Sequence, residues 1–159
     1  MREILFRGKQ FEFKNNRIIP LNWVEGFYYD NKTHRLRIYD EQSEKYCYKN
    51  FPYILVYDKH FGQVPTLGNM GSPVFLDVIS ETVGQYTGLT DKNGKKIFEG
   101  DIVDFDIRGE DESYGVVKYS NEETEFYITF DNSILGLGRN FYSQGIEVIG
   151  NIHDTPELI

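Results

Sequence analysis

The stretch TGLTDKNGKKIFEGDIV, residues 87–103, decides how the second half of this 159-residue chain is interpreted. It holds three glycines, three acids and a pair of adjacent lysines. The same residue types occur in phosphate-binding loops, in metal-binding loops and in tight backbone turns. All three interpretations therefore have to be compared by spacing.

Spacing argues against a phosphate-binding loop and against a calcium-binding loop. A P-loop needs four residues between its glycines and a hydroxyl residue after the lysine, but five residues separate Gly88 from Gly94, and two lysines follow. A calcium loop that starts at Asp91 needs a glutamate at its twelfth position, where Ile102 stands.

Turn geometry is the interpretation that remains for this stretch. Asparagine and glycine tolerate positive φ, so Asn93-Gly94 predicts a type I′ turn with positive φ at both residues. Gly88 is expected to serve turn geometry as well, and Gly100 is expected to open a strand. The stretch is therefore predicted to be two turns that lead into a small barrel.

Alternating apolar and polar residues predict short strands beyond these turns. The expected strands cover residues 100–107, 114–120, 125–130 and 146–152, a number and length typical of an SH3-like barrel. Side chains two apart in a strand share a face. The residues expected to face the core are Val103, Phe105, Ile107, Phe126, Ile128 and Phe130.

The first half of the chain is also predicted to be rich in β-strands. Residues 23–30 and 33–40 alternate on either side of an Asp-Asn-Lys turn, which predicts a hairpin. Further strands are expected at 44–50, 53–58 and 74–79. Residues 59–73 look like a long loop. One helical turn is expected after residue 79, with Ser80 as its cap. The predicted domains are residues 1–79 and 80–159.

Composition agrees with a mainly β protein that has little helix. The chain has no alanine, the best helix former, but it has 12 Phe, 12 Tyr and 15 Gly. The single cysteine, Cys47, excludes an internal disulfide and suits a packed thiol in a reducing compartment. The charged N-terminus does not resemble a signal peptide, and no segment is long and apolar enough for a membrane. A cytoplasmic protein is expected.

Acidic residues concentrate in one segment. The formal net charge is −8, and residues 101–131 contain ten acids and two bases, which accounts for the whole excess. Such a segment repels nucleic-acid phosphate and suits a basic partner. The competing explanation is a solvated hairpin whose charges protect strand edges and solubility. The acids expected to form a partner-binding face are Asp104, Asp106, Glu110, Asp111 and Glu112.

A second charged region, residues 1–17, has the opposite sign, with five bases and two acids. Bases beside aromatic rings can form a platform for single-stranded nucleic acid. The residues suited to this role are Arg7, Phe11, Phe13 and Lys14. The competing explanation is that these aromatic rings belong to the core and the bases to a solvated rim.

Asp104, Asp106 and Glu125 are the candidate residues for catalysis. Asp104 and Asp106 lie roughly 7 Å apart on one strand face, a spacing that acid/base pairs use, and Glu125 is a third candidate. A catalytic acid needs a cleft that raises its pKa, but the neighbours here are acids and polar turns. No enzyme is expected. His34, His60 and His153 stand apart in the sequence, so no metal or cofactor site is expected either.

Several of these segments resemble the YopX family of small phage and prophage proteins. The resemblance lies in REILFRGK (2–9), NWVEGFYY (22–29), ETVGQYTGLTDKNGKKIFEGDIV (81–103) and IEVIGNIHDTPEL (146–158). It implies a mainly β fold with an SH3-like C-terminal part and a bacterial cytoplasmic setting. It implies no reaction and no catalytic residues. Residues 30–73 look longer than the connector usual in the family.

The function expected from the sequence is that of a non-enzymatic phage or prophage accessory protein. Its expected partner is a protein that binds the acidic C-terminal face. Nucleic-acid binding through the N-terminal basic and aromatic face is the alternative, and the many aromatic residues and strand edges also allow self-association. The sequence does not identify the partner.

Overall fold

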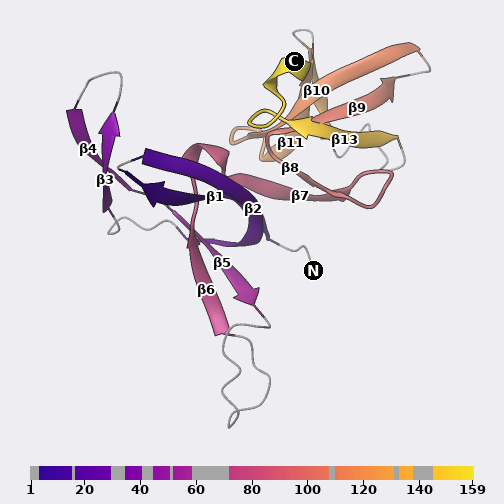
Figure 1. Ribbon diagram of the computed structural model, residues 1–159. Helices are drawn as coiled ribbons and strands as arrows, with labels where there is room; N and C mark the ends of the chain where they lie inside the picture. The colour runs from indigo at the N-terminus through magenta and orange to yellow at the C-terminus, as the bar shows by residue number, and fades with distance from the viewer. Residues whose placement is uncertain are drawn as a thin grey trace. The chain divides into compact units, whose positions relative to one another are not determined.

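The fold is mainly β, which confirms the class predicted from the sequence. The computed structural model describes residues 4–15, 17–29, 35–40, 45–50, 52–58, 72–107, 110–130, 133–137 and 145–159. Its strands form antiparallel pairs (Figure 1). Within the described residues no helix has the length and apolar character needed to cross a membrane.

The chain divides into two compact units, which are described separately. The N-terminal unit is Leu5–Val83, and the C-terminal unit is Gly84–Ile159 together with Met1–Ile4. The boundary between residues 83 and 84 lies four residues beyond the one expected from the sequence. The expected long loop at 59–73 lies outside the described residues, except for its last two, which already belong to a strand.

The N-terminal unit contains a sheet in which four strands follow the order β6-β5-β2-β1. These strands are β1 (Phe6–Lys14), β2 (Arg17–Tyr29), β5 (Tyr53–Asp58) and β6 (Ser72–Asp77). The strands β3 (Arg35–Asp40) and β4 (Lys45–Asn50) form a separate two-stranded sheet. The predicted hairpin between residues 23–30 and 33–40 is therefore wrong, because β2 pairs with β1 and β5, and β3 pairs with β4. Alternation predicts a strand but does not specify its partner.

Near the start of β1 the N-terminal unit is closely packed. Gly8 lies against Val78, which is fully buried, and an added Cβ would meet the Val78 side chain at 3.0 Å. The 3₁₀ turn η1 (Ser80–Thr82) is held there, since Thr82 Oγ1 accepts a hydrogen bond from the Lys9 amide and donates one to the Ile79 carbonyl. The turn predicted at this point exists, but Ile79 and not Ser80 occupies the capping position.

The C-terminal unit contains a sheet with strand order β12-β11-β10-β9-β13 and a preceding hairpin (Figure 1). The hairpin is β7 (Gly84–Thr90) with β8 (Lys96–Phe98). The sheet strands are β9 (Asp101–Ile107), β10 (Glu110–Ser120), β11 (Glu125–Phe130), β12 (Ser133–Gly136) and β13 (Ile146–Asn151). All four strands predicted after residue 100 are present. Closure into an SH3-like barrel stays a prediction.

The core of the C-terminal unit contains the residues that alternation predicted. Val103, Phe105 and Ile128 are fully buried, Phe126 is buried, and Phe130 packs against the cluster while half-buried. The side chain of Ile107 lies outside the described residues. The remaining members of this cluster are Ile97, Val117, Leu137, Ile146 and Val148.

The turns of the quoted stretch follow the glycines, as predicted, but one turn has a different type. Gly88, Gly94 and Gly100 have φ of 89°, 81° and 82°, the left-handed region that glycine enters without strain. Asn93 does not share it, so the predicted type I′ turn is wrong. The Gly94 amide donates to the Asp91 carbonyl, and the Asp91 amide donates to the Lys95 carbonyl. This pattern is typical of a type I turn followed by a one-residue bulge, in which glycine alone needs positive φ.

The C-terminal tail is folded into turns that the Asn151 side chain stabilises. The Asn151 side chain accepts hydrogen bonds from the amides of His153 and Asp154, and the Asn151 amide donates to Thr155 Oγ1. Gly150 makes this possible, because an added Cβ would lie 2.1 Å from Thr155 Oγ1. The 3₁₀ turn η2 (Pro156–Leu158) follows.

Candidate functional site

The acidic segment forms strands β9, β10 and β11 of the C-terminal unit. Within it, Asp104 lies opposite Tyr114 on β10 and opposite Glu147 on β13. The sequence neighbours of Asp104 and Glu147 on both sides are buried, so these side chains point away from the core. Glu147, Asp104 and Tyr114 therefore form one cross-strand row on the outer face, which we call the outer row.

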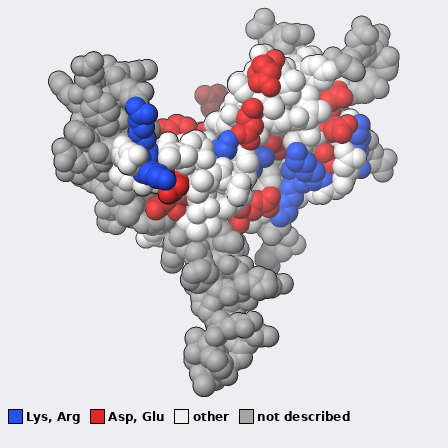
Figure 2. Space-filling model, viewed as in Figure 1, with Lys and Arg blue, Asp and Glu red and all other residues white. Residues whose placement is uncertain are grey.

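The outer row is polar and partly accessible to solvent. Tyr114 is 40% exposed, and Asp104 and Glu147 are half-buried. Acidic side chains are distributed over the visible side of the C-terminal unit, with basic ones among them (Figure 2). The visible side of this unit therefore carries both signs of charge.

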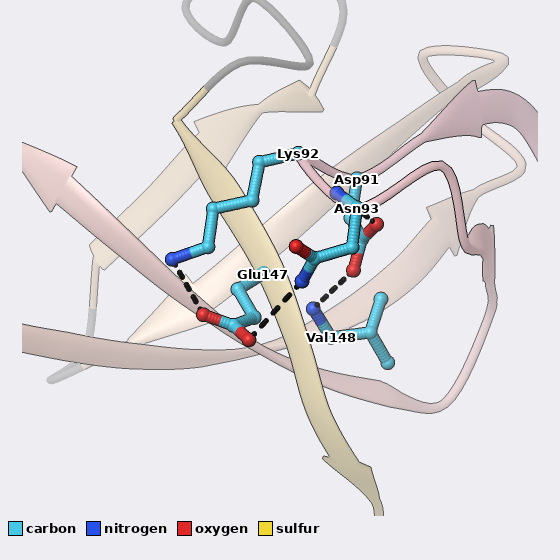
Figure 3. Close-up of polar contacts among 5 residues, drawn as sticks. All are labelled: Asp91, Lys92, Asn93, Glu147 and Val148. Atoms are coloured by element: carbon cyan, nitrogen blue, oxygen red, sulfur yellow. Dashed lines mark hydrogen bonds and ion pairs between the residues drawn. The ribbon is translucent and has the colours of Figure 1, made fainter.

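A basic side chain, Lys92, contacts this row. Its ammonium forms an ion pair with Glu147 at 2.5 Å, and Asn93 Nδ2 donates to the other oxygen of the same carboxylate at 3.2 Å (Figure 3). The hydrogen bond from Lys92 lowers the pKa of Glu147 below its ordinary value, and the same bond raises the pKa of Lys92. Both side chains are accessible to solvent, so this ion pair adds little stability. Its main effect is that the Lys92 charge offsets the negative charge of Glu147.

The loop that carries Lys92 and Asn93 is positioned by Asp91. This side chain is buried, and Oδ1 accepts hydrogen bonds from the amides of Asn93 and Lys95, each at 2.8 Å. Its second oxygen, Oδ2, accepts from the Val148 amide on β13 at 3.1 Å (Figure 3). In addition, the Lys92 amide donates to the Ile146 carbonyl. The turn therefore bonds to β13 on both sides of Glu147.

The charge of Asp91 is stabilised by these amides. Burial raises the pKa of its carboxyl, but the hydrogen bonds from Val148, Lys95 and Asn93 together outweigh this effect and leave the pKa below its ordinary value. Both carboxylate oxygens of Asp91 accept hydrogen bonds from backbone amides, so the role of this side chain is to stabilise the turn. This agrees with the prediction that the quoted stretch serves backbone geometry.

The residues proposed for an acidic face are placed only in part. Asp104 belongs to the outer row. The side chains of the other four lie outside the described residues, although their backbone lies in strands: Asp106, Glu110, Asp111 and Glu112.

The structure does not bring Glu125 to Asp104. Asp104 lies opposite Tyr114, and Glu125 lies opposite Ser120 on the same strand β10. Six residues of strand separate these two positions, which corresponds to roughly 20 Å. An acid/base pair between Asp104 and Glu125 is therefore ruled out by register. Alternation indicates which side chains share a face, but it could not give the separation of Asp104 from Glu125 along the sheet.

The N-terminal residues considered for nucleic-acid binding do not form one exposed surface. Arg7 and Phe11 are buried, whereas Phe13 is exposed. Lys14 follows Phe13 in a strand and points to the opposite face. A cation–aromatic contact of this unit lies at Trp23, whose ring centre is 4.8 Å from the Arg7 guanidinium and 5.6 Å from the Lys9 ammonium.

Sequence reasoning missed three members of the site. They come from three separate segments of the chain: Tyr114, Glu147 and Lys92. Strand register places Tyr114 and Glu147 beside Asp104, and the β7–β8 turn brings Lys92 to Glu147. A signal for the turn was present, since Asp at the first position and Gly at the fourth is the preferred pattern of a type I turn. Within the described residues, no group of three or more histidine, cysteine or acidic side chains is placed to hold a metal ion.

Comparisons with known proteins identify a family. The family model described as YopX protein matches residues 26–159, which is most of the chain and confirms the resemblance seen in the sequence. The crystal structure of protein EF1440 from Enterococcus faecalis is similar over 99% of both chains, with 20% sequence identity and a TM-score of 0.43. No curated protein matches the chain.

Proposed function

We propose, from the premise that this chain belongs to the YopX protein family, that it is a non-enzymatic accessory protein of a phage or prophage that binds another protein. The binding surface we propose is the acidic face of the C-terminal unit, centred on the outer row of Glu147, Asp104 and Tyr114. The observation that carries this proposal is that the exposed Tyr114 lies in register with the carboxylates of Asp104 and Glu147. Tyr114 and Asp104 belong to residues 101–131, the segment that accounts for the whole net negative charge of the chain.

The chemistry of the outer row suits a basic side chain of a partner. A guanidinium or ammonium group can lie on the face of the Tyr114 ring while it bonds to the Asp104 carboxylate beside it. Tyrosine is also enriched at protein interfaces, because it buries a large area with few rotatable bonds. The wider acidic segment would attract a basic partner and speed its association at low ionic strength.

A pull-down from host lysate tests this proposal. The variant neutralises the acids by Asp104→Asn, Asp106→Asn, Glu110→Gln, Asp111→Asn and Glu112→Gln. A matched control removes five charges outside the segment by Glu12→Gln, Glu25→Gln, Glu81→Gln, Asp154→Asn and Glu157→Gln. We expect the control to retain the partners of the wild type and the first variant to lose them. Identical partner sets for wild type and first variant would contradict the proposal.

Nucleic-acid binding through the N-terminal unit is the weaker alternative. Two of its four candidate residues, Arg7 and Phe11, are buried, and the chain carries a formal charge of −8 that opposes phosphate. Titration of the protein with single- and double-stranded oligonucleotides at two salt concentrations tests it. A salt-dependent affinity that decreases on Lys14→Ala would favour this alternative over the acidic face.

A further inference from the structure

The β7–β8 turn carries the one Asn-Gly sequence of the chain, at Asn93 and Gly94. Both residues are exposed to solvent. Glycine has no Cβ to shield its backbone nitrogen, and nothing lies within 4 Å of a Cβ added at Gly94. Asparagine is one of the chemically labile residues of proteins. The Gly94 nitrogen is therefore open to the reaction that makes asparagine labile.

In that reaction the backbone nitrogen of Gly94 attacks Cγ of the Asn93 side chain. The attacking nitrogen gives its proton to water and the side-chain nitrogen leaves as ammonia, so that a succinimide ring forms. Water then opens the ring at either of its carbonyl groups, which leaves aspartate or isoaspartate at position 93. Each product has a carboxylate where the amide stood, and water is the only co-reactant.

Two hydrogen bonds of the turn oppose this attack. The Gly94 amide donates to the Asp91 carbonyl at 3.0 Å, which retains the proton that has to leave. Asn93 Nδ2 donates to Oε1 of Glu147 at 3.2 Å, which holds the side-chain amide beside β13 (Figure 3). The second bond joins side chains that are accessible to solvent and can bond to water instead, so its net strength is small. Both bonds therefore slow the reaction without preventing it.

We propose that Asn93 is a site of spontaneous deamidation in the folded protein, and that the hydrogen bond from its side chain to Glu147 limits the rate. This inference does not depend on the proposed function, because it concerns only the covalent chemistry of the turn. It concerns the charge beside the outer row, since deamidation replaces a donor to Glu147 by a second carboxylate.

The isoaspartate product would also change the backbone of the turn. It adds a methylene group to the chain between residues 93 and 94. The amides of Asn93 and Lys95 both donate to Oδ1 of Asp91 at 2.8 Å, and the longer chain cannot keep both bonds in this geometry. The isoaspartate form, separated from aged protein, should therefore unfold at a lower urea concentration than the unmodified protein.

Peptide mapping of aged protein tests the site. Wild type is incubated in mildly alkaline buffer beside a synthetic peptide of residues 82–99, and digestion at glutamate releases the same peptide from the protein for mass spectrometry. We expect the protein to react about a hundredfold more slowly than the peptide at most, since each of the two hydrogen bonds contributes a factor of about ten or less. The products should be separate aspartate and isoaspartate forms of this peptide.

The expected rate distinguishes reaction in the folded state from reaction through unfolding. A reaction that required complete unfolding would be slower than that of the peptide by a factor of about a thousand or more. Asn151, which precedes the β-branched Ile152, is the internal control and should remain unmodified. Absence of product at Asn93 after about a hundred half-lives of the synthetic peptide would overturn the inference.

Variants at Glu147 test what limits the rate. Glu147→Ala removes the acceptor of the Asn93 side chain, so deamidation should become about two- to tenfold faster, the factor that corresponds to one hydrogen bond. Glu147→Gln retains an oxygen that can accept the same bond and should react like wild type. Urea midpoints establish that each variant is folded. A folded Glu147→Ala protein that reacts at the wild-type rate, or a Glu147→Gln protein that reacts as fast as Glu147→Ala, would overturn the role given to Glu147.

Gly94→Ala tests the attacking nitrogen independently of Glu147. The added methyl group crowds the backbone nitrogen of residue 94, while Asn93 and Glu147 are retained. Deamidation of Asn93 should be largely lost in this variant under the conditions used for wild type. Equal amounts of product from Gly94→Ala and wild type would overturn the inference.

Discussion

Two hairpin turns of this protein both reverse the chain but are held very differently. The β7–β8 turn is fixed by Asp91, whose buried carboxylate bonds to two amides of the turn and to Val148, 57 residues away. The β1–β2 turn passes through Asn15, at φ of 52°, and its described residues are exposed. The difference shows that a turn contributes to tertiary stability when one of its side chains accepts a hydrogen bond from a strand distant in the sequence.

The largest effect is expected from Asp91→Ala, which removes the acceptor shared by three amides. Loss of hydrogen bonds to a buried charged group should lower the free energy of unfolding by about 3 kcal/mol or more. Equilibrium unfolding in urea measures it. Lys92→Ala, which removes only the exposed ion pair with Glu147, is the control and should leave the midpoint unchanged. Equal losses in both variants would contradict the role given to Asp91.

Gly84→Ala should have the next largest effect, at the start of the same hairpin. An added Cβ would lie 2.4 Å from the Glu99 carbonyl oxygen, which belongs to the backbone and cannot rotate away. We expect a loss of about 2 to 3 kcal/mol in the free energy of unfolding. The control is Gly145→Ala, where nothing lies within 4 Å of the added Cβ. If Gly84→Ala were as stable as this control, the backbones at Gly84 and Glu99 would be able to move apart at little cost in free energy.

Acid titration should distinguish Asp91 from Glu99, another carboxyl of the same unit. The pKa of Asp91 is lowered, so its stabilisation is complete above the ordinary value of 3.8 and is lost as pH falls through the folded-state pKa. The pKa of Glu99 is raised by burial, so its contribution is present below 4.5 and is lost as pH rises through the folded-state pKa. Urea midpoints should therefore fall less steeply on the acid side in Asp91→Asn and rise near pH 7 in Glu99→Gln. The reverse pattern would contradict both assignments.

Gly94→Ala sharpens the comparison by separating backbone strain from crowding. Gly94 has φ of 81°, but nothing lies within 4 Å of an added Cβ. Only the cost of positive φ remains, and we expect a loss of about 1 kcal/mol in the free energy of unfolding. Urea unfolding beside Gly84→Ala measures it. A loss as large as that of Gly84→Ala would mean that the turn is more crowded than its geometry indicates.

The smallest effect is expected from Asn15→Gly in the β1–β2 turn. Glycine relieves the positive φ of residue 15, and no long-range bond depends on this exposed position, so a gain of about 0.5 kcal/mol is expected. The measurement is again urea unfolding, at a concentration where the protein is monomeric. A loss of more than about 1 kcal/mol would show that this turn is also fixed by tertiary contacts.

The two turns also show how far sequence reasoning reached at the candidate site. Alternation placed Asp104 on the outer face, opposite in phase to the buried Val103 and Phe105. It could not say that Tyr114 and Glu147 would stand beside Asp104, because register depends on which strands pair and where bulges fall. For the same reason alternation predicted a hairpin between residues 23–30 and 33–40, whereas β2 pairs with β1 and β5.

Sequence alone determined the local character of this protein. Aromatic and glycine content indicated the β class, the glycines of residues 87–103 indicated where the chain turns, and charge counting located the acidic segment. These properties depend on neighbours in the chain. Tertiary structure decided the partners of β2, the meeting of Asp91 with Val148, and the outer row. Those depend on hydrogen bonds between residues distant in sequence, which pairing and burial select and which no local pattern encodes.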